Sequence, residues 1–329
     1  MTVTASTTET RIRPLNIRDD LLEVADLIEI CFASTLDEEG RDFLRHLRAA
    51  ARDARYLSWM QSAADRMLSH APLYGFVWDQ DGRIVGNLNL FPIPRGGTVL
   101  YWIANVAVHP DYRRLGIARQ LTRRALRFLR ERGIHTAWLQ VRDDNPVAYH
   151  LYQSLGFIER YRRSTWQADG RNPLPRPASS GITVRARQST DWASQADWLR
   201  RLYPAEVGHS LSLNIPLLGP GLWSRLLRLL EGKEQEDWCA SDGKTLLAAA
   251  SWQPARGLID PLWVASSGER EEEALAALLQ QARQSLAFRS HPLQVNYPAG
   301  RADEAFRRAG FWLHQTLVWM SIDTGKAES

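Results

Sequence analysis

The chain has few residues of several kinds, and each shortage excludes a class of protein. Only two of its 329 residues are cysteine, Cys31 and Cys239, too few for a disulfide framework or, by themselves, for a zinc site. Three lysines stand against 38 arginines, and the chain has no lysine-rich tail or basic low-complexity block. With a net charge of only +4, the composition indicates neither a metal protein nor a nucleic-acid-binding protein.

Long hydrophobic runs are also missing. No apolar stretch approaches the roughly 18 residues that a membrane span requires. The first ten residues are polar and lack the apolar segment of a secretory signal. We therefore expect a cytoplasmic protein with no membrane partner and with its two thiols reduced and buried. Apolar residues make up 44% of the chain, enough for ordinary cores in about two domains.

A β-run, a glycine-containing turn and a helical pattern follow one another around residue 110. The β-run ends at His109-Pro110, and Leu121, Ala125 and Leu129 lie on one face of the helical pattern. Backbone N–H groups at such a turn and helix start form a site for an anion, and Gly116 has no Cβ to block its approach. We expect a pyrophosphate ligand. The three spaced glycines of a dinucleotide fingerprint and the Lys-Ser/Thr pair of a P-loop are both absent.

A second motif lies downstream of the predicted strand 135–141. Asn145 followed by Pro146 predicts the cap and first residue of a helix, and Gly156 predicts its end. Asn145 and Tyr152 are seven residues apart, so two helical turns place them on the same face.

These two motifs resemble the landmarks of the GNAT acyltransferase superfamily. Arg113-x-x-Gly-x-Ala resembles its coenzyme A loop, and the Asn…Leu-Tyr…Leu-Gly-Phe pattern resembles its second landmark, over about residues 74–166. The resemblance implies a mixed α/β sheet and an N-acetyltransferase that moves the acetyl group of acetyl-CoA to a primary amine of a small molecule or protein. It assigns cofactor binding to Val106, Ala107, Val108, Arg113, Arg114, Leu115, Gly116, Ile117, Ala118, Arg119, Asn145 and Tyr152.

The resemblance also implies catalytic roles. The pyrophosphate lies on the amides of residues 114–119, and a backbone N–H near Val106 stabilises the oxyanion of the tetrahedral intermediate. Tyr152 is the general acid for the leaving thiolate, because a tyrosine with a pKa near 10 is protonated at neutral pH. Asn145 contacts the pantetheine arm.

The general base has no clear candidate. Gln140 matches a glutamate of enzymes resembling bacterial ribosomal-protein N-terminal acetyltransferases, and Asn105 stands at the other position where many members carry an acid. Neither side chain can take a proton. His109 is a weak candidate, while Asp143 and Asp144 belong to the turn before a helix.

The chain contains an internal repeat. Gln140 precedes Gly156 by sixteen residues, and Gln294 precedes Gly310 by the same distance. Ile12-Arg13 leading to Asp19 resembles Val184-Arg185 leading to Asp191, and a Pro/Gly/Ser-rich stretch separates the copies. We expect tandem domains at residues 1–168 and 181–325, joined by a linker at 169–180.

The second copy lacks the chemistry of the first. Ala299 and Phe306 replace Asn145 and Tyr152, and four glutamates, at 269 and 271–273, stand where an anion would bind. We therefore expect a degenerate GNAT-like domain that is structural or shapes the substrate site.

The first copy also has a predicted order of elements. It is strand 12–17, helices 21–32 and 37–68, strands 74–78, 84–90 and 99–108, the loop and its helix, strand 135–141, helix 146–155 and strand 157–166. The longer helical region at 37–68 is expected to shape the acceptor site.

Alternatives remain open. One is a non-catalytic acyl-CoA-binding sensor or scaffold, suggested by the missing base. Another is a tandem enzyme resembling mycothiol synthase, although that family is described as active in its C-terminal copy. A nucleic-acid-binding module would rest only on the arginine excess. We expect a monomer or a homodimer.

Overall fold

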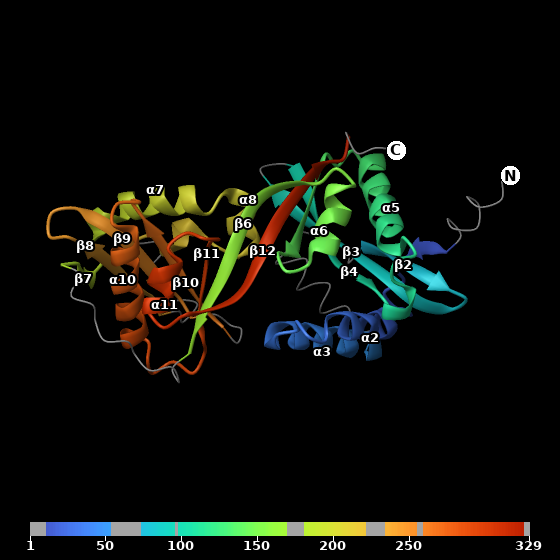
Figure 1. Ribbon diagram of the computed structural model, residues 1–329, viewed down its shortest axis with the longest axis horizontal. Helices are drawn as coiled ribbons and strands as arrows, with labels where there is room; N and C mark the ends of the chain where they lie inside the picture. The colour runs from blue at the N-terminus through green and yellow to red at the C-terminus, as the bar shows by residue number, and fades with distance from the viewer. Residues whose placement is uncertain are drawn as a thin grey trace. The chain divides into compact units, whose positions relative to one another are not determined.

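The computed structural model describes residues 11–53, 74–95, 98–169, 181–221, 234–254 and 259–325. Its contacts divide the chain into two units, residues 1–161 with 317–329 and residues 162–316. The predicted mixed α/β class is confirmed, since strands pair in both directions and helices pack on them. Figure 1 shows the elements.

The first unit contains a mixed sheet in the order β1-β2-β3-β4-β5-β12-β6. Its strands are β1 (Ile12–Pro14), β2 (Tyr74–Gln80), β3 (Arg83–Arg95), β4 (Thr98–Val108), β5 (Thr136–Arg142), the start of β6 (Ile158–Ala168) and the end of β12 (Trp312–Asp323). Its helices are α2 (Leu21–Phe32), α3 (Glu38–Arg52), η1 (Pro110–Tyr112), α5 (Ile117–Glu131) and α6 (Pro146–Gln153).

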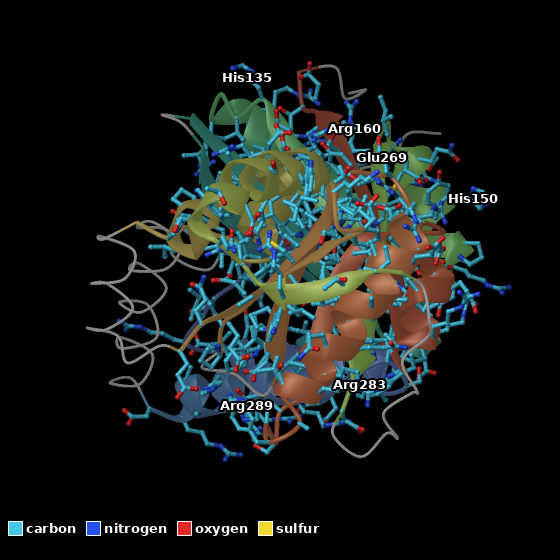
Figure 2. All side chains as sticks on the ribbon, turned by 90° about the vertical axis from the view of Figure 1, so that its left-hand side faces the viewer. His135, His150, Arg160, Glu269, Arg283 and Arg289 are labelled. Atoms are coloured by element: carbon cyan, nitrogen blue, oxygen red, sulfur yellow. The ribbon has the colours of Figure 1, made fainter. Side chains whose placement is uncertain are left out.

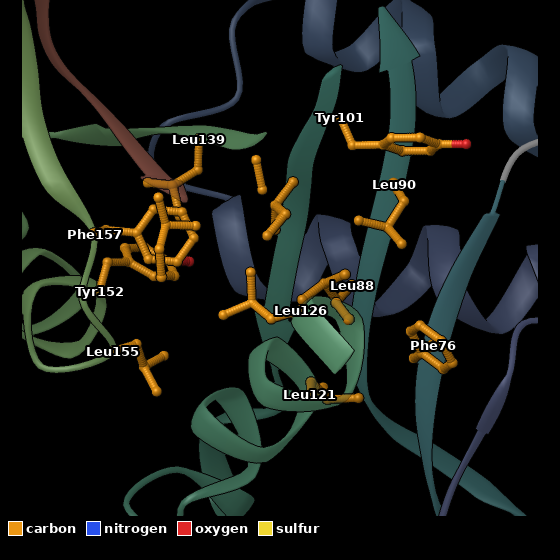
Figure 3. Packing of buried hydrophobic residues seen from close by; sticks show 14 of the residues in the cluster. Phe76, Leu88, Leu90, Tyr101, Leu121, Leu126, Leu139, Tyr152, Leu155 and Phe157 are labelled. Atoms are coloured by element: carbon orange, nitrogen blue, oxygen red, sulfur yellow. The ribbon is translucent and has the colours of Figure 1, made fainter. Parts of the chain in front are cut away.

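Apolar spacing explains the two helical layers of this unit. In α2, Leu21, Val24 and Ile28 recur at helical spacing and are buried against a cluster that includes Val77 and Ile84 of the sheet. α5 and α6 cover the opposite face, where Figure 3 shows Tyr152 and Phe157 beside Leu139. The sheet therefore has one hydrophobic core on each face.

The second unit has the order β12-β6-β11-β10-β9-β8-β7. It adds β7 (Thr183–Ala186), β8 (Glu236–Ser241), β9 (Leu246–Trp252), β10 (Asp260–Ser266) and β11 (Leu293–Pro298). Its helices are η2 (Ser189–Asp191), α7 (Trp192–Leu202), α8 (Ala205–Ser210), η3 (Ile215–Leu218), α10 (Glu271–Ser285) and α11 (Asp303–Arg308).

The unit boundaries differ from the expected division at residues 169–180. The chain leaves the first unit within β6 and returns to it within β12, whose residues 317–323 pair with β5. β6 in turn pairs with β11 over residues 163–168. Almost all of the predicted linker, and residues 54–68 of the predicted helix 37–68, lie outside the described residues.

The repeat is present in the structure, with one correction. Arg13 pairs with Asp20 at 2.6 Å, and Arg185 pairs with Asp191 at the same distance. The counterpart of Asp191 is thus Asp20 and not Asp19, whose carboxylate accepts from Asn16. Arg13 favours Asp20 because that residue is buried where β1 leads into α2, whereas Asp19 is exposed.

The ends of three predicted helices agree with the structure within a few residues, but the predicted helix 37–68 is interrupted, since α3 ends at Arg52 and Asp53 is extended. α2 spans the predicted residues, and α5 ends at Glu131, just before Gly133 at φ +68°. β1 is shorter than expected and ends at Pro14, although the Leu15 amide still donates to the Gly75 carbonyl at 3.0 Å.

Candidate functional site

The loop between β4 and α5 has a backbone that few residues adopt. Arg114 and Gly116 both have left-handed conformations, with φ of +64° and +79°, and α5 begins at the next residue. A Cβ at position 116 would find only the Gln120 amide within 4 Å, at 3.8 Å. The glycine thus faces open space, where a side chain would obstruct a ligand on the loop.

The backbone N–H groups of residues 114–119 are unpaired within the described part of the chain. No described residue accepts a hydrogen bond from the amides of residues 114–119, and the first paired amide is that of Gln120, which donates to Gly116 at 3.0 Å. Because these residues form a turn and the first turn of a helix, their amides add to the positive end of the α5 dipole. This geometry fits a phosphate or pyrophosphate.

Arginines flank the loop. Arg113 is exposed and donates from Nε to the Val108 carbonyl at 3.3 Å, and Cys31 Sγ contacts the same oxygen at 3.2 Å. Burial raises the pKa of the Cys31 thiol, while nearby Arg113 opposes that shift. Arg114 is exposed and Arg119 is half-buried, so both side chains remain near solvent at the loop.

β4 and β5 separate next to this loop. Their parallel pairing covers only Tyr101–Ala137, Trp102–Trp138 and Ile103–Leu139, although β4 continues to Val108 and β5 to Arg142. Val106 and Val108 therefore lie on a part of β4 that no longer pairs with β5. A gap in a parallel ladder leaves backbone groups of both strands available to a ligand.

α6 places the second predicted pair of residues. Asn145 accepts from the Ala148 amide at 3.1 Å and caps the helix, as its position before Pro146 predicted. Tyr152 is buried in the core and packs edge-on to Phe157, with ring centroids 5.8 Å apart. Burial raises the pKa of Tyr152 well above its ordinary value, which keeps the phenol protonated. No described residue forms a hydrogen bond with its hydroxyl.

The positions of possible bases are also defined. Gln140 lies in β5 opposite Trp319 of β12, and the Asn105 side chain donates to Asn89 at 3.1 Å. Hydrogen bonding to Arg142 lowers the pKa of Asp144, which is exposed in the turn. The ring of His109 accepts from the Asp111 amide at 3.4 Å and lies 3.2 Å from Arg83.

Sequence reasoning missed two buried polar residues of β3. Asn87 and Asn89 are fully or almost fully buried and share one face of the strand. They form hydrogen bonds with each other and with Asn105. The alternation Gly-Asn-Leu-Asn-Leu at 86–90 was the available signal, since two amides on one face of a central strand are uncommon.

The loop before α10 in the second unit has the same backbone pattern as the loop before α5 but different side chains. Gly268 and Arg270 are left-handed, with φ of +95° and +45°, and α10 begins at Glu271. The Glu271 carboxylate accepts from Tyr297 at 2.7 Å, from Arg301 at 2.7 Å and from Ser266. Glu269, labelled in Figure 2, lies in the same loop. An internal carboxylate thus stands at the start of this helix.

The second unit also has a separated strand pair. β10 and β11 pair only at Asp260–Leu293 and Pro261–Gln294. Beyond this point Tyr203 bridges the two strands, donating to Asn296 at 2.9 Å and Val264 at 3.3 Å. Its ring packs edge-on against Trp263, so a buried side chain occupies the gap.

Two features are absent from the described residues. No helix there is long and apolar enough to cross a lipid bilayer. No group of three or more His, Cys, Asp or Glu side chains in the same ranges is arranged to hold a metal ion.

Comparison with known proteins identifies relatives of the first unit. Residues 40–157 match the model of the acetyltransferase (GNAT) family. The ribosomal protein bS18-alanine N-acetyltransferase of Escherichia coli K12 is 45% identical over 69 residues, 20% of this chain and 47% of that protein. N-alpha-acetyltransferase 30 of Schizosaccharomyces pombe is 34% identical over 93 residues, 28% and 61% of the two chains. The chain thus spans about half the length of these curated relatives.

Solved structures share the fold of the whole chain. A tandem GNAT protein from the clavulanic acid biosynthesis pathway matches with a TM-score of 0.51 and 16% identity, over 96% of this chain and 99% of that one. A GCN5-related N-acetyltransferase from Sphaerobacter thermophilus matches with a TM-score of 0.59 and 16% identity, over 95% and 96%. These likenesses show that the chain has the fold of a tandem GNAT protein, and within the chain residues 40–157 are similar to the acetyltransferase (GNAT) family.

Proposed function

We propose that the chain is an N-acetyltransferase that moves the acetyl group of acetyl-CoA to a primary amine in a ternary complex. The acceptor is a small molecule or a protein, at its N-terminus or a lysine. The first unit holds the active site, and the second is a degenerate copy that has kept the fold. Relatives named as a ribosomal protein bS18-alanine N-acetyltransferase and as N-alpha-acetyltransferase 30 support this reaction class.

One observation carries the proposal. Six successive amides, at residues 114–119, have no acceptor among the described residues and lie beside a separated pair of parallel strands. The amides suit a pyrophosphate, and the exposed backbone of β4 suits the amide groups of a pantetheine arm. We expect residues 106–108 and Asn145 to contact that arm, and Arg113, Arg114 and Arg119 to add positive charge around the phosphates.

Two groups of the chain act on the reacting atoms. The Val106 N–H donates to the thioester carbonyl and stabilises the negative charge that develops on its oxygen. Tyr152 donates a proton to the departing thiolate, a role that its raised pKa permits because the phenol stays protonated. Holding both substrates in line supplies the remainder of the rate enhancement.

The attacking amine must lose a proton, yet neither of the two positions where related enzymes carry a general base has a carboxylate. Asn105 and Gln140 carry amides, so we propose that solvent accepts this proton. The same feature favours the second candidate function, an acyl-CoA-binding sensor that performs no transfer. Turnover of acetyl-CoA with an amine panel separates the two, because a sensor binds the thioester and leaves it intact.

Calorimetry with acetyl-CoA tests the proposal. We expect wild type to bind one equivalent, and Gly116→Trp to lose binding because the indole covers the loop amides. Gly133→Trp is the matched control, since Gly133 also has positive φ and open surroundings but lies at the far end of α5. Binding that survives Gly116→Trp, or a second equivalent bound by wild type, would contradict a single site in the first unit.

A further inference from the structure

β4 contains a bulge next to the point where it leaves β5. Asn89 of β3 is opposite Ala104, and Asn87 is opposite Ala107, so two residues of β4, Asn105 and Val106, face one residue of β3. Asn105 has a φ of +52°, a left-handed conformation that a residue with a side chain adopts at an energetic cost. Surrounding contacts must therefore hold the bulge in this shape.

Asn87 supplies such a contact. Its side-chain Nδ2 donates to the Asn105 carbonyl at 3.0 Å and to Asn89 Oδ1 at 2.9 Å, and Asn105 Nδ2 donates to the same oxygen at 3.1 Å. Asn87 is fully buried, so water does not compete for these bonds.

The orientation of each amide follows from the Asn105 carbonyl. A carbonyl oxygen accepts only from an N–H, so the Asn87 amino group must face it, and Asn89 must then turn its oxygen toward that amino group. The opposite ends, Asn87 Oδ1 and Asn89 Nδ2, are buried without a partner among the described residues.

Holding this carbonyl also orients the next amide. The peptide unit is planar and trans, so the carbonyl of Asn105 and the N–H of Val106 point in opposite directions. Since the carbonyl points to the Asn87 side chain on β3, the Val106 N–H points away from β3. β5 flanks β4 on that side, and the two strands are no longer paired there.

We propose that Asn87 is a positioning residue for acyl transfer, whose side-chain amide holds the Asn105–Val106 peptide so that the Val106 N–H meets the thioester carbonyl. The inference rests on the proposed function. In this proposal Asn87 does not contact the substrate and takes part in no covalent step. Asn89 orients the Asn87 side chain by accepting its hydrogen bond, but it forms no hydrogen bond with the Asn105–Val106 peptide group itself.

The carbonyl stretch of bound acetyl-CoA labelled with carbon-13 at the thioester tests this without a known acceptor. A hydrogen bond from Val106 weakens the carbonyl bond, so we expect its infrared band to move to lower wavenumber when wild type binds. Asn87→Asp at pH 8 replaces the donor by an acceptor, and we expect most of this displacement to disappear while calorimetry shows acetyl-CoA still bound. In a turnover assay the variant is expected to lose about 10²–10³-fold in kcat with little change in KM.

Asn89→Asp is the matched control. It introduces the same charge at the neighbouring buried position, yet it keeps an oxygen to accept from Asn87 and Asn105. We expect it to keep the band displacement. Lowering the pH should restore the displacement in Asn87→Asp, because a protonated carboxyl can again donate to the Asn105 carbonyl.

Each outcome is decisive. If wild type does not bind acetyl-CoA, the proposed function and this inference fail together. If wild type binds acetyl-CoA without a band displacement, the role of Val106 and this inference fail, whereas the proposal that the chain binds acetyl-CoA is kept. An equal displacement in wild type and Asn87→Asp overturns the inference alone. If Asn87→Asp does not fold, Asn87→Ser with Asn89→Ser as its control applies the same test without a buried charge.

Discussion

The loops before α5 and α10 have the same backbone and opposite chemistry. In each, a left-handed residue directly precedes the helix and another lies two residues earlier. The first presents unpaired amides next to separated strands, whereas in the second Glu271 occupies the helix start and Tyr203 fills the strand gap. The same backbone geometry thus carries unpaired amides in one unit and an internal carboxylate in the other, so the backbone alone does not decide whether such a loop is open to a ligand.

The aromatic pairs beneath the second landmark extend this comparison. Tyr152 packs edge-on to Phe157 at 5.8 Å, and Phe306 packs edge-on to Phe311 at 6.1 Å. Phe306 also stacks on Trp166 at 5.0 Å. The second unit has therefore kept the packing of this helix and lost its hydroxyl.

The largest expected effect comes from removing residues 317–329, which deletes the part of β12 that belongs to the first unit. Val318, Trp319 and Met320 are fully buried there, and each contributes about 1.5–3 kcal/mol through burial. Their sum is comparable to the stability of a whole domain, so we expect the truncated chain to lose cooperative unfolding of the first unit. Calorimetric unfolding checks this against a control chain that ends at Gly325. Equal unfolding of the two chains would show that the first unit does not need β12.

Tyr152→Phe tests whether the hydroxyl that distinguishes the first aromatic pair from the second is needed for catalysis. We expect turnover to fall about 10²–10⁴-fold through loss of the general acid, with acetyl-CoA affinity unchanged. Stability should change little, because the lost hydroxyl has no partner among the described residues. Steady-state kinetics and thermal unfolding provide the measurements.

The mirror variant Phe306→Tyr adds a hydroxyl to the fully buried counterpart and should cost about 1–3 kcal/mol of stability with no effect on turnover. Unchanged turnover in Tyr152→Phe would remove the acid role and leave Tyr152 as a packing residue.

Glu271→Gln examines the internal carboxylate of the second unit. Burial alone would raise the pKa of Glu271, but hydrogen bonds from Arg301, Ser266 and Tyr297 outweigh it and hold the pKa below its ordinary value. We expect the variant to lose about 1.5–3 kcal/mol at pH 7, since hydrogen bonds to a charged group are lost.

The pH dependence of this effect has a defined sign. A folded-state pKa below the unfolded one gives stability that is present above the ordinary carboxyl pKa, about 4.3, and is lost as the pH falls through the lowered value. Wild type and variant should therefore converge in acid, as denaturant midpoints can show. Glu273→Gln is the control, because that half-exposed residue pairs with nearby Arg270 and with no other residue that the structure describes. A constant difference down to strong acid would contradict the assignment.

The smallest effect is expected at the cap of α6. Asn145→Ala should cost about 1 kcal/mol, because the Ala148 amide of α6 loses its acceptor, whereas the equivalent amide of α11, that of Ala305, donates to Glu272 at 2.7 Å. Asn145→Asp keeps an oxygen that can cap α6 but removes the side-chain amide group, so it tests the contact with acetyl-CoA separately from the cap. Weaker binding by Asn145→Asp at unchanged stability would support that contact, whereas equal affinity would make Asn145 a cap alone.

Local signals predicted the parts of the site that are continuous in sequence. The strand, Gly116 and the apolar spacing of α5 indicated the loop, and Asn145-Pro146 indicated the α6 cap. Side chains that meet across strands were not predicted. The Asn87–Asn105 bond joins positions 18 residues apart, and the Tyr203–Asn296 bond joins positions 93 apart, with no pattern to connect them.

By itself, the sequence determined the element types, the two copies and the loss of the motif in the second, because these depend on residues close along the chain. Only the tertiary structure decided to which unit each half of β6 and β12 belongs and that Arg13 pairs with Asp20. It also decided that Glu271 accepts hydrogen bonds at the start of α10 and that Tyr203 fills the gap between β10 and β11. Strand pairing and ion pairing depend on which distant segments meet, and similar copies offer similar partners. The choice between them is made by the packed fold as a whole.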